Sequence, residues 1–304
     1  MAPPVPEEVE VAIVGGGPAG LSAALLLGRC RRRLAVYDTG APRNGPSAEV
    51  RGFLTRDGTP PLELLAIART ELARYGIAVR PLEVTRVDRA ESGFVVTAAD
   101  DGSVRSRCVV LATGVRDVLP PLAGLPPLYG RSVFSCPYCD AWEVRDEPLA
   151  VYGRGDHVAR LAIALRLWSR DVVVCTDGTA AMSDGARGEL AAAGIAIRDE
   201  RIRALEGSNG RLTAIRFASG ELVPRRALFL ALGQRQSSPL AAPLGCRLTP
   251  DGGIEVDARQ ESSVPGVFVV GDASRDVQLA IVAAAEGATA AVAINKQLGA
   301  APVR

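Results

Sequence analysis

Short apolar runs separated by glycine-rich turns dominate the start of the chain. Residues 9–14 are expected to form a strand with Glu10 pointing outward, and residues 21–27 an apolar helix. A second apolar strand is expected at 34–37. The turn between the first strand and the helix is Gly-Gly-Gly-Pro-Ala-Gly, residues 15–20. This order of strand, turn, helix and strand is the context in which a glycine motif binds a dinucleotide.

The glycine turn has the spacing G-x-G-x-x-G, with glycines at 15, 17 and 20. Such glycines permit a tight turn and bring a pyrophosphate close to the helix N-terminus, where free N–H groups and the helix dipole favour anions. Asp38 follows the second strand roughly 20 residues after the first glycine, where an acid bonds a ribose hydroxyl. The motif therefore predicts a bound dinucleotide, and a glycine turn without a ligand is the alternative.

The chain then becomes irregular before a new apolar pattern begins. Residues 39–61 are rich in glycine and proline, and a loop this long inside a domain is usually functional. A helix is expected at 61–75. Short alternating strands follow at 83–88, 93–98 and 104–112, with Asp101-Gly102 as a hairpin turn, and the last strand ends in Ala-Thr-Gly at 112–114.

A second strand–turn–helix–strand pattern lies in the middle of the chain. Strands are expected at 149–152 and 171–175, with a helix at 159–168 after the turn at 153–159. Near the end, an alanine-rich helix is expected at about 277–297.

Length and composition set limits on this picture. A chain of 304 residues with 48% hydrophobic residues can bury two cores of domain size. The 35 basic residues balance the 34 acidic ones, so no large net charge attracts nucleic acid or an anionic membrane. No apolar segment reaches the length of a membrane span, and the first residues lack the regions of a signal peptide. We expect a cytoplasmic protein, with the arginine run at 29–33 as the solvated end of a helix.

The sequence Ser-Cys-Pro-Tyr-Cys-Asp-Ala-Trp at 135–142 carries the candidate chemistry. Cys136 and Cys139 form a C-x-x-C pair, which is usually half of a metal site or a redox couple. A structural zinc site needs four ligands, but the other cysteines are solitary and His157 is the only histidine. A redox pair is therefore favoured and no metal is expected. A glutaredoxin-like domain also uses C-P-Y-C, but near the start of a small domain.

Together these motifs resemble low-molecular-weight thioredoxin reductases over nearly the whole chain. The resemblance rests on the glycine turn, Asp38, the Ala-Thr-Gly at 112–114, the C-P-Y-C-D at 136–140 and the Val-Phe-Val-Val-Gly-Asp-Ala at 267–273. It implies an α/β fold with two Rossmann-like dinucleotide-binding domains, each a three-layer ββα arrangement, the second inserted in the first. The FAD-binding domain would comprise residues 1–117 and 240–304, and the inserted NAD(P)-binding-like domain residues 118–239.

The resemblance also implies a flavin site and a homodimer held by surfaces of the FAD domain. The N-terminus of the last helix would point at the flavin pyrimidine ring, where negative charge accumulates on reduction. The residues assigned to FAD are Gly15, Gly17, Pro18, Ala19, Gly20, Asp38, Arg43, Asn44, Thr113, Gly114, Gly271, Asp272, Gln278, Leu279 and Ala280.

The same resemblance gives roles to the redox pair and its neighbour. Cys139 would lie against the flavin, and Cys136 would be the partner that exchanges with substrate sulfur. Cysteines at a helix start have lowered pKa values, which favours the reactive thiolate. Asp140, if desolvated, would have a raised pKa and would move a proton between a substrate thiol and solvent. The alternative for Asp140 is a solvated acid at a helix N-terminus.

The second glycine turn departs from the reductase pattern. Its candidate NAD(P) residues are Gly153, Gly155, Asp156 and His157, but Val158 takes the third glycine position. Thioredoxin reductases place basic residues after the next strand to hold the 2′-phosphate of NADPH, whereas this chain has Asp177, which would repel it. NADPH binding is thus left open, because the loop can serve only to pack its helix, and His157 is expected to be an ordinary helix-start residue.

The motifs leave the direction of electron flow open between a reductase and an oxidase. The C-P-Y-C-x-x-W-E wording and Gly-Phe-Leu-Thr-Arg-Asp-Gly at 52–58 resemble the branch that includes the dithiol oxidases of gliotoxin- and holomycin-type compounds, although those commonly have histidine in place of Asp140. We predict an FAD-dependent thiol–disulfide oxidoreductase that oxidises a small-molecule dithiol with oxygen. The alternatives are an NADPH-dependent reductase of a thioredoxin-like protein and a non-catalytic flavin redox sensor. Tyr138, Trp142 and Trp168 are expected to be packing groups, with the lining of a substrate cleft as the alternative for the first two, which are near the cysteines.

Overall fold

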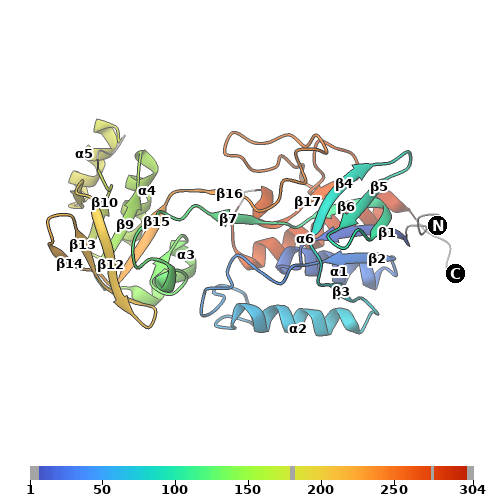
Figure 1. Cartoon of the computed structure of the whole chain (residues 1–304), viewed down its shortest axis with the longest axis horizontal. Coiled ribbons are helices and arrows are strands. Elements are labelled where there is room, and N and C mark those ends of the chain that lie inside the picture. Colours follow the sequence, from blue (N-terminus) through green and yellow to red (C-terminus); the bar gives the residue numbers. More distant parts are fainter. Residues whose placement is uncertain (1–6, 179–181, 275–276, 300–304) are drawn as a thin grey trace. The chain divides into compact units, whose positions relative to one another are not determined.

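In the computed structural model, a seven-stranded sheet combines six strands from the start of the chain with one strand, β17, from near its end (Figure 1). Its order is β3-β2-β1-β6-β5-β4, with β17 also paired to β6. Strands β1, β2, β3, β6 and β17 run parallel, whereas β4 and β5 are antiparallel to their neighbours. The bounds are β1 Glu7–Val14, β2 Leu34–Tyr37, β3 Val79–Arg80, β4 Val84–Arg89, β5 Phe94–Ala98, β6 Ser103–Leu111 and β17 Val267–Val269.

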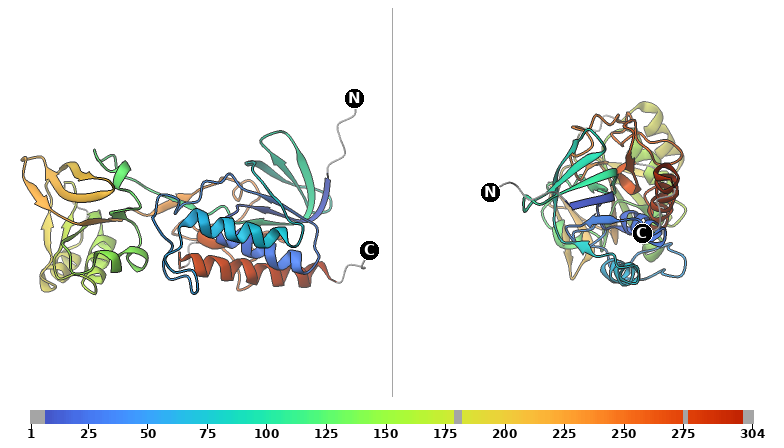
Figure 2. Two further views of the ribbon diagram at one scale, coloured as in Figure 1. Left: turned by 90° about the horizontal axis from the view of Figure 1, so that it is seen from below. Right: turned by 90° about the vertical axis from the view of Figure 1, so that its right-hand side faces the viewer.

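Three helices cover one face of this sheet: α1 (Pro18–Arg29), α2 (Pro61–Ala73) and α6 (Ala280–Leu298). They lie side by side in Figure 2. Alternation along β1 sends Val11 and Ile13 into the core under these helices, and Ala12 and Val14 into the core on the opposite face. The parallel strands are buried on both faces, which explains their continuous apolar runs.

A second sheet has five parallel strands in the order β11-β10-β9-β15-β8. One face packs against α4 and α5 and the other against a three-stranded antiparallel sheet, β12-β13-β14. The bounds are β8 Val133–Phe134, β9 Leu149–Gly153, β10 Val172–Cys175, β11 Ala196–Arg198, β12 Ile202–Ser208, β13 Arg211–Phe217, β14 Leu222–Pro224, β15 Ala227–Ala231, α4 Asp156–Leu165 and α5 Asp184–Ala192.

The structure describes residues 7–178, 182–274 and 277–299, and the chain divides into two compact units. The first unit comprises residues 1–45, 52–116 and 235–304, and the second residues 46–51 and 117–234. The chain thus passes between the units after residues 45, 51, 116 and 234. At the last two passages β7 (Val115–Asp117) and β16 (Gln234–Gln236) pair as a two-stranded sheet. The predicted ends of the flavin domain, 1–6 and 300–304, lie outside the described residues.

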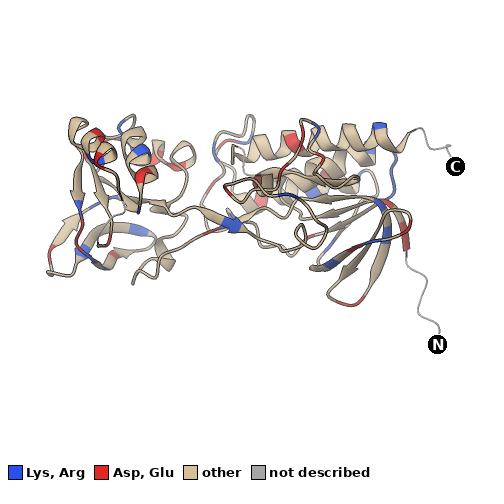
Figure 3. Cartoon of the chain, turned by 90° about the horizontal axis from the view of Figure 1, so that it is seen from above, with Lys and Arg blue, Asp and Glu red and all other residues tan. Residues whose placement is uncertain are grey.

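Two expectations about charged residues are wrong. Glu10 does not point outward but is 8% exposed, and its Oε1 accepts a hydrogen bond from Arg32 Nη1 at 2.9 Å. In the run 29–33, Arg29, Arg31 and Arg33 are exposed as expected, but Arg32 is buried after α1 and donates to Asn295 of α6. Elsewhere, charges of both signs are interspersed on each unit (Figure 3).

Two helices begin at other residues than expected. Helix α4 begins at Asp156 and ends at Leu165, three residues earlier at each end than the expected 159–168, because Gly155 with φ 76° ends the turn directly before it. Helix α6 begins at Ala280, so Gln278 and Leu279 precede it. None of the helices in the described part of the chain is both long and apolar enough to span a membrane.

Candidate active site

Cys136 and Cys139 lie at the start of a helix of four residues, α3 (Pro137–Asp140), in the second unit. They form a disulfide with Cα atoms 5.4 Å apart. Cys136 is the N-cap, and its Sγ accepts a hydrogen bond from the Cys139 N–H at 3.2 Å. A thiolate at Cys136 would keep this donor. So short a helix has little dipole, so this N–H is the main local group that stabilises negative charge on the sulfur.

Asp140 is half-buried directly after the pair. Burial, with a smaller contribution from the nearby Glu143, raises its pKa to about 7, although Arg51 opposes the shift. Arg51 Nε lies 3.1 Å from Glu143 Oε1. A carboxyl group that is half-ionised near neutral pH can both take and give a proton, as an acid–base group for thiols must.

Two aromatic side chains flank the disulfide, and they are not the packing groups that the sequence suggested. Tyr138 is 76% exposed and Trp142 is 63% exposed. The Tyr138 ring meets the half-buried Trp168 edge to face at 5.9 Å, and the Arg145 guanidinium lies over the Trp142 ring at 4.2 Å. Their exposure makes an apolar surface beside the sulfurs that a substrate can contact.

The glycine turn of the first unit is shaped by close backbone approaches. A Cβ on Gly15, which has φ 114°, would lie 2.2 Å from the Ala112 oxygen, and one on Gly20 would lie 1.9 Å from the Gly15 oxygen. No larger residue fits at either position. By contrast, nothing lies within 4 Å of a Cβ placed on Gly17 or on Gly114. The turn is therefore packed behind and open in front, which is the cradle that a pyrophosphate needs.

Hydrogen bonds connect several of the predicted flavin residues to other polar side chains of the same unit. Asp38 follows β2, and its Oδ2 accepts a hydrogen bond from Arg69 Nη2 of α2 at 2.5 Å. Arg43 Nη1 donates to Asp272 Oδ2 and to Gln278 Oε1, both at 2.8 Å. Asp272 lies in a 3-10 helix, η3 (Gly271–Ser274), directly before α6. The structure thus brings together three predicted flavin residues that are far apart in the sequence.

The other predicted flavin residues lie in the same unit. Pro18 and Ala19 open α1, Asn44 follows Arg43, and Thr113 and Gly114 follow β6. Leu279 is the N-cap of α6, and Ala280 is its first residue. Gly271 N–H donates to Glu286 Oε2 at 2.6 Å, a buried acid that sequence reasoning missed. The sequence feature that could have indicated Glu286 is an acid in the middle of an otherwise apolar, alanine-rich helix. Together these residues fit FAD: the glycine turn would hold the pyrophosphate, and Asp38 a ribose.

Comparison with known proteins decides the family. The model of the pyridine nucleotide-disulphide oxidoreductase family matches residues 9–287. The chain belongs to this family. A probable thioredoxin reductase of Arthroderma benhamiae is 32% identical over 297 residues, with 87% of this chain and 74% of that protein covered. The crystal structure of HlmI has a TM-score of 0.92 at 37% identity, covering 96% of this chain and 92% of that one.

A thioredoxin reductase of Streptomyces coelicolor is 30% identical over 298 residues, covering 93% of this chain and 91% of that protein. With its C-x-x-C disulfide, the chain is a flavoprotein of the thioredoxin reductase type, an FAD-dependent disulfide oxidoreductase with the mixed α/β fold of that group.

In this thioredoxin-reductase-type protein, one carboxylate lies at the second glycine turn and another at the end of the strand that follows it. Asp156 is the first residue of α4 and accepts hydrogen bonds from Ser183 N and Oγ. Asp177, just after β10, accepts from Ile202 N at 2.7 Å and from Tyr152 Oη at 3.2 Å. His157 Nε2 lies 2.6 Å from the Ala231 oxygen of β15, so this histidine ties the helix start to the sheet. Gly153 also packs closely on this strand, since a Cβ placed on it would lie 2.5 Å from the Ala231 oxygen.

The four remaining cysteines of the oxidoreductase are free thiols. Cys108, Cys175 and Cys246 are buried, and Cys30 is exposed at the end of α1. Burial raises the pKa of Cys108 to about 11 and that of Cys175 to about 12, so both stay neutral thiols. Neither supplies a nucleophile near neutral pH.

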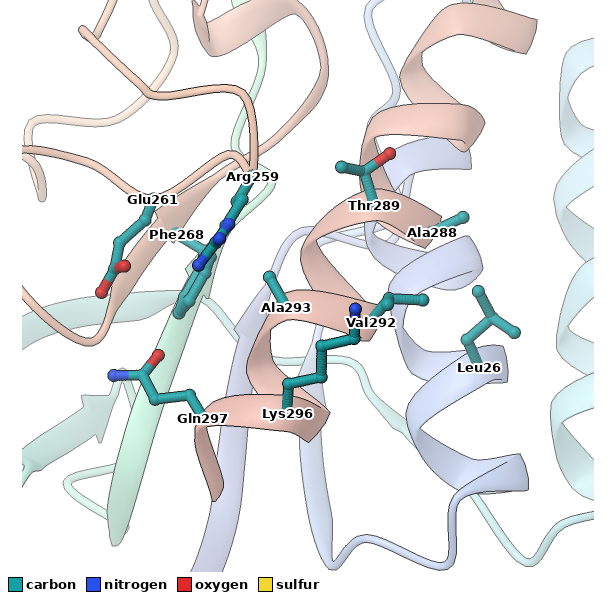
Figure 4. Close-up of a pocket in the computed structure, with 10 residues that line it drawn as sticks. All are labelled: Leu26, Arg259, Glu261, Phe268, Ala288, Thr289, Val292, Ala293, Lys296 and Gln297. Carbon is teal, nitrogen blue, oxygen red and sulfur yellow. The ribbon is translucent and has the colours of Figure 1, made fainter. Parts of the chain in front are cut away.

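A groove of about 750 Å³ lies on the first unit of the oxidoreductase, away from the predicted flavin residues (Figure 4). One wall is the outer side of α6 with Leu26 of α1, and the other is the segment that carries Arg259 and Glu261. None of the predicted site residues lines it, so we do not assign the redox chemistry to this groove.

Proposed function

We propose that the protein oxidises a small-molecule dithiol to a disulfide, with oxygen as the final electron acceptor. The first unit is the FAD-binding domain in this proposal, and the second is a dinucleotide-binding-like domain that carries the Cys136–Cys139 pair. We also propose that the protein is a homodimer in the cell interior, as in the family that it resembles.

The observation that carries this proposal is the pair of acids at the two places where NADPH phosphates would bind, one at the second glycine turn and one after β10. The 2′-phosphate of NADPH would lie near the end of β10, where Asp177 presents a carboxylate instead of an arginine. Asp156 adds a second carboxylate at the N-terminus of α4, where a pyrophosphate would need free N–H groups. The negative carboxylates at both places repel the negative phosphates of NADPH and weaken its binding. We therefore favour the thiol substrate as the source of electrons.

The protein residues perform the thiol chemistry in balanced steps. The Asp140 carboxylate takes the proton of a substrate thiol, and the resulting thiolate attacks Cys136 Sγ while the bond to Cys139 breaks. After Asp140 has passed the first proton to solvent, it takes the proton of the second substrate thiol. The second thiolate then attacks the substrate sulfur of the mixed disulfide, which forms the substrate disulfide and releases a Cys136 thiolate. The substrate loses two electrons and two protons, and the cysteine pair gains the two electrons. When bound, FAD supplies the two-electron carrier that passes these electrons from the cysteines to oxygen.

A second candidate is NADPH-dependent reduction of a thioredoxin-like protein. The names of the Arthroderma and Streptomyces relatives favour it, since both are called thioredoxin reductases. In that reaction the electrons would flow in the opposite direction, from NADPH to the same cysteines and then to the protein substrate. A third candidate is a flavin redox sensor without turnover.

An anaerobic titration separates the candidates. Purified protein is titrated with NADPH, with NADH and with dithiothreitol while the flavin absorbance band is followed. We expect dithiothreitol alone to bleach the flavin and colour to return on admission of air. Bleaching by stoichiometric NADPH or NADH would overturn the proposal in favour of a reductase, because Asp177 disfavours only the 2′-phosphate, which NADH lacks. A dithiol that bleaches without catalytic oxygen uptake would indicate the sensor.

Cysteine variants test the site itself. Cys136→Ser and Cys139→Ser should each abolish dithiol-dependent oxygen uptake while FAD stays bound, because neither variant can close the disulfide. Cys30→Ser is the matched control, since Cys30 is an exposed thiol in the other unit. Full activity in either redox variant would contradict the mechanism.

A further inference from the structure

The segment Pro46–Arg51, here called the strap, belongs to the second unit although the residues on both sides of it belong to the first. Its last residue, Arg51, makes an ion pair from Nε to Glu143 Oε1 at 3.1 Å, and another to Glu49 within the strap. Glu143 lies in a 3-10 helix, η2 (Trp142–Val144), directly after the redox helix. The strap therefore ends on the element that follows the disulfide.

The other end of the strap rests on Gly130, which has φ 75°. A Cβ at Gly130 would lie 2.7 Å from the Pro46 carbonyl carbon and 2.8 Å from the Ser47 nitrogen. Because both neighbours are backbone atoms, only glycine allows this approach. Between the two ends, Val50 is 4% exposed. The strap is thus docked at both ends on the unit that contains the disulfide.

Within the described residues, two charged side chains act on Asp140, and they come from two elements. Glu143 of η2 raises the pKa of Asp140, and Arg51 of the strap lowers it, both after the larger effect of burial. Helix α3 contributes no other charged side chain, since its remaining residues are proline, tyrosine and cysteine. Arg51 is therefore the group that offsets both burial and Glu143.

We propose that Arg51 is a positioning residue of the redox site, held by the strap against Glu143 so that this ion pair sets the electrostatic environment in which Asp140 exchanges protons. The inference rests on the acid–base role of Asp140 in the proposed function. It does not depend on the direction in which electrons flow, because the same thiol–disulfide exchange occurs in both directions.

The exchange step can be measured in the intact protein by counting thiols, without using the flavin absorbance. Dithiothreitol opens the Cys136–Cys139 disulfide, the reaction is quenched with a maleimide, and labelled thiols are counted by mass spectrometry. We expect the rate in the wild-type protein to rise with a midpoint near pH 7 as Asp140 ionises, and this rise to be absent in Asp140→Asn. Dithiothreitol thiolate adds a separate increase at higher pH.

Two variants should move this midpoint in opposite directions. Arg51→Gln removes a positive charge, so Asp140 ionises at higher pH, and Glu143→Gln removes a negative charge, so Asp140 ionises at lower pH. We expect shifts of roughly half a pH unit, the effect of one unit charge several ångströms away through water. The double variant should return toward the wild-type midpoint, because the two changes cancel.

Matched controls separate this tuning from a general loss of an ion pair. Arg216→Gln and Glu206→Gln break a pair of similar exposure in the same unit, from Nε to Oε1 at 2.7 Å, and should leave the midpoint unchanged. Gly130→Ala, which displaces the strap, should shift the midpoint as Arg51→Gln does. Gly194→Ala, also at positive φ but with open space around its Cβ, should not.

Unchanged midpoints in Arg51→Gln and Glu143→Gln, or shifts of the same sign, would overturn the inference. The absence of a midpoint in the wild-type protein would overturn it together with the role of Asp140. Neither result would affect the oxidase proposal, which is decided by the flavin titration and oxygen uptake. Conversely, a protein bleached by NADPH could still show both opposite shifts, and the inference would stand.

Discussion

Asp140 is the residue whose environment does most to determine the chemistry. Burial raises its pKa from an ordinary value to about 7, so the folded protein binds a proton there at pH values where the unfolded chain does not. The stability that this proton gives is fully present below the unfolded pKa and is lost as pH rises through about 7. A carboxylate kept at this position despite its cost to stability indicates a functional role.

We predict that Asp140→Asn lowers the rate of thiol–disulfide exchange at pH 7.5 by about 100-fold or more, the usual size of a lost acid–base group. The variant should also resist urea better than the wild type at pH 8 but equally well at pH 4, because it has no carboxylate to desolvate. The measurements are quenched-flow labelling and equilibrium unfolding. Glu189→Gln, an exposed acid on α5, should change neither. A wild-type rate in Asp140→Asn would make Asp140 a structural acid.

At the scale of elements, the turn between β1 and α1 joins packing to binding. Gly20 brings the helix against the strand, and Gly17 leaves space in front of the helix N-terminus. The two glycines therefore have different roles in one motif: Gly20 allows close packing, and Gly17 leaves space for a ligand. A substitution at each position should separate folding from cofactor binding.

We predict that Gly20→Ala destabilises the protein by about 1–3 kcal/mol, the usual cost of overpacking, because its Cβ would meet the Gly15 oxygen. Gly17→Ala, with open space around its Cβ, should leave the melting temperature of the cofactor-free protein unchanged but lower the FAD content after purification. Thermal unfolding and the absorbance ratio of flavin to protein check both. If Gly17→Ala retained full FAD, the pyrophosphate would not approach this turn.

Local patterns explain what could be predicted from the sequence. The apolar run 34–37 has the bounds of β2 because all four residues are apolar and the last three are buried. Cys136 and Cys139 meet because they are neighbours in one turn. Strand β3 was missed because two half-buried residues carry no periodicity. The contact of Arg51 with Glu143 was also missed, since it joins residues that only the folded strap brings together.

At the scale of the whole molecule, the buried pair of Glu10 and Arg32 links distant parts of the first unit. Arg32 Nε donates to Asn295 Oδ1 at 2.8 Å, so β1, the end of α1 and α6 meet at one guanidinium. Burial alone would raise the pKa of Glu10, but hydrogen bonds from the Arg33 N–H and from Arg32 hold it below its usual value. This stability is present above the unfolded pKa and is lost as pH falls through the folded pKa.

We predict that Arg32→Gln costs about 3–5 kcal/mol at pH 7, because it leaves the Glu10 carboxylate buried without its partner. The difference from the wild type should shrink in acid, where Glu10 is protonated in both proteins. Urea unfolding at several pH values measures this. The exposed pair of Arg247 and Glu255 supplies the control, and Arg247→Gln should have only a small effect. An equal loss in both variants would contradict the buried role of Arg32.

The late position of β17 and α6 in the sequence has a consequence for biosynthesis. Strand β17 pairs with β6, and α6 packs on α1, so the sheet edge and apolar helix face made first stay open until the ribosome has released residues 267–298. The second unit, almost wholly within 117–234, has no such delay. Nascent chains therefore carry a finished thiol-exchange unit beside a half-built partner that needs protection from aggregation. The proposed flavin site includes Asp272, so FAD binding to it must wait until this residue has left the ribosome.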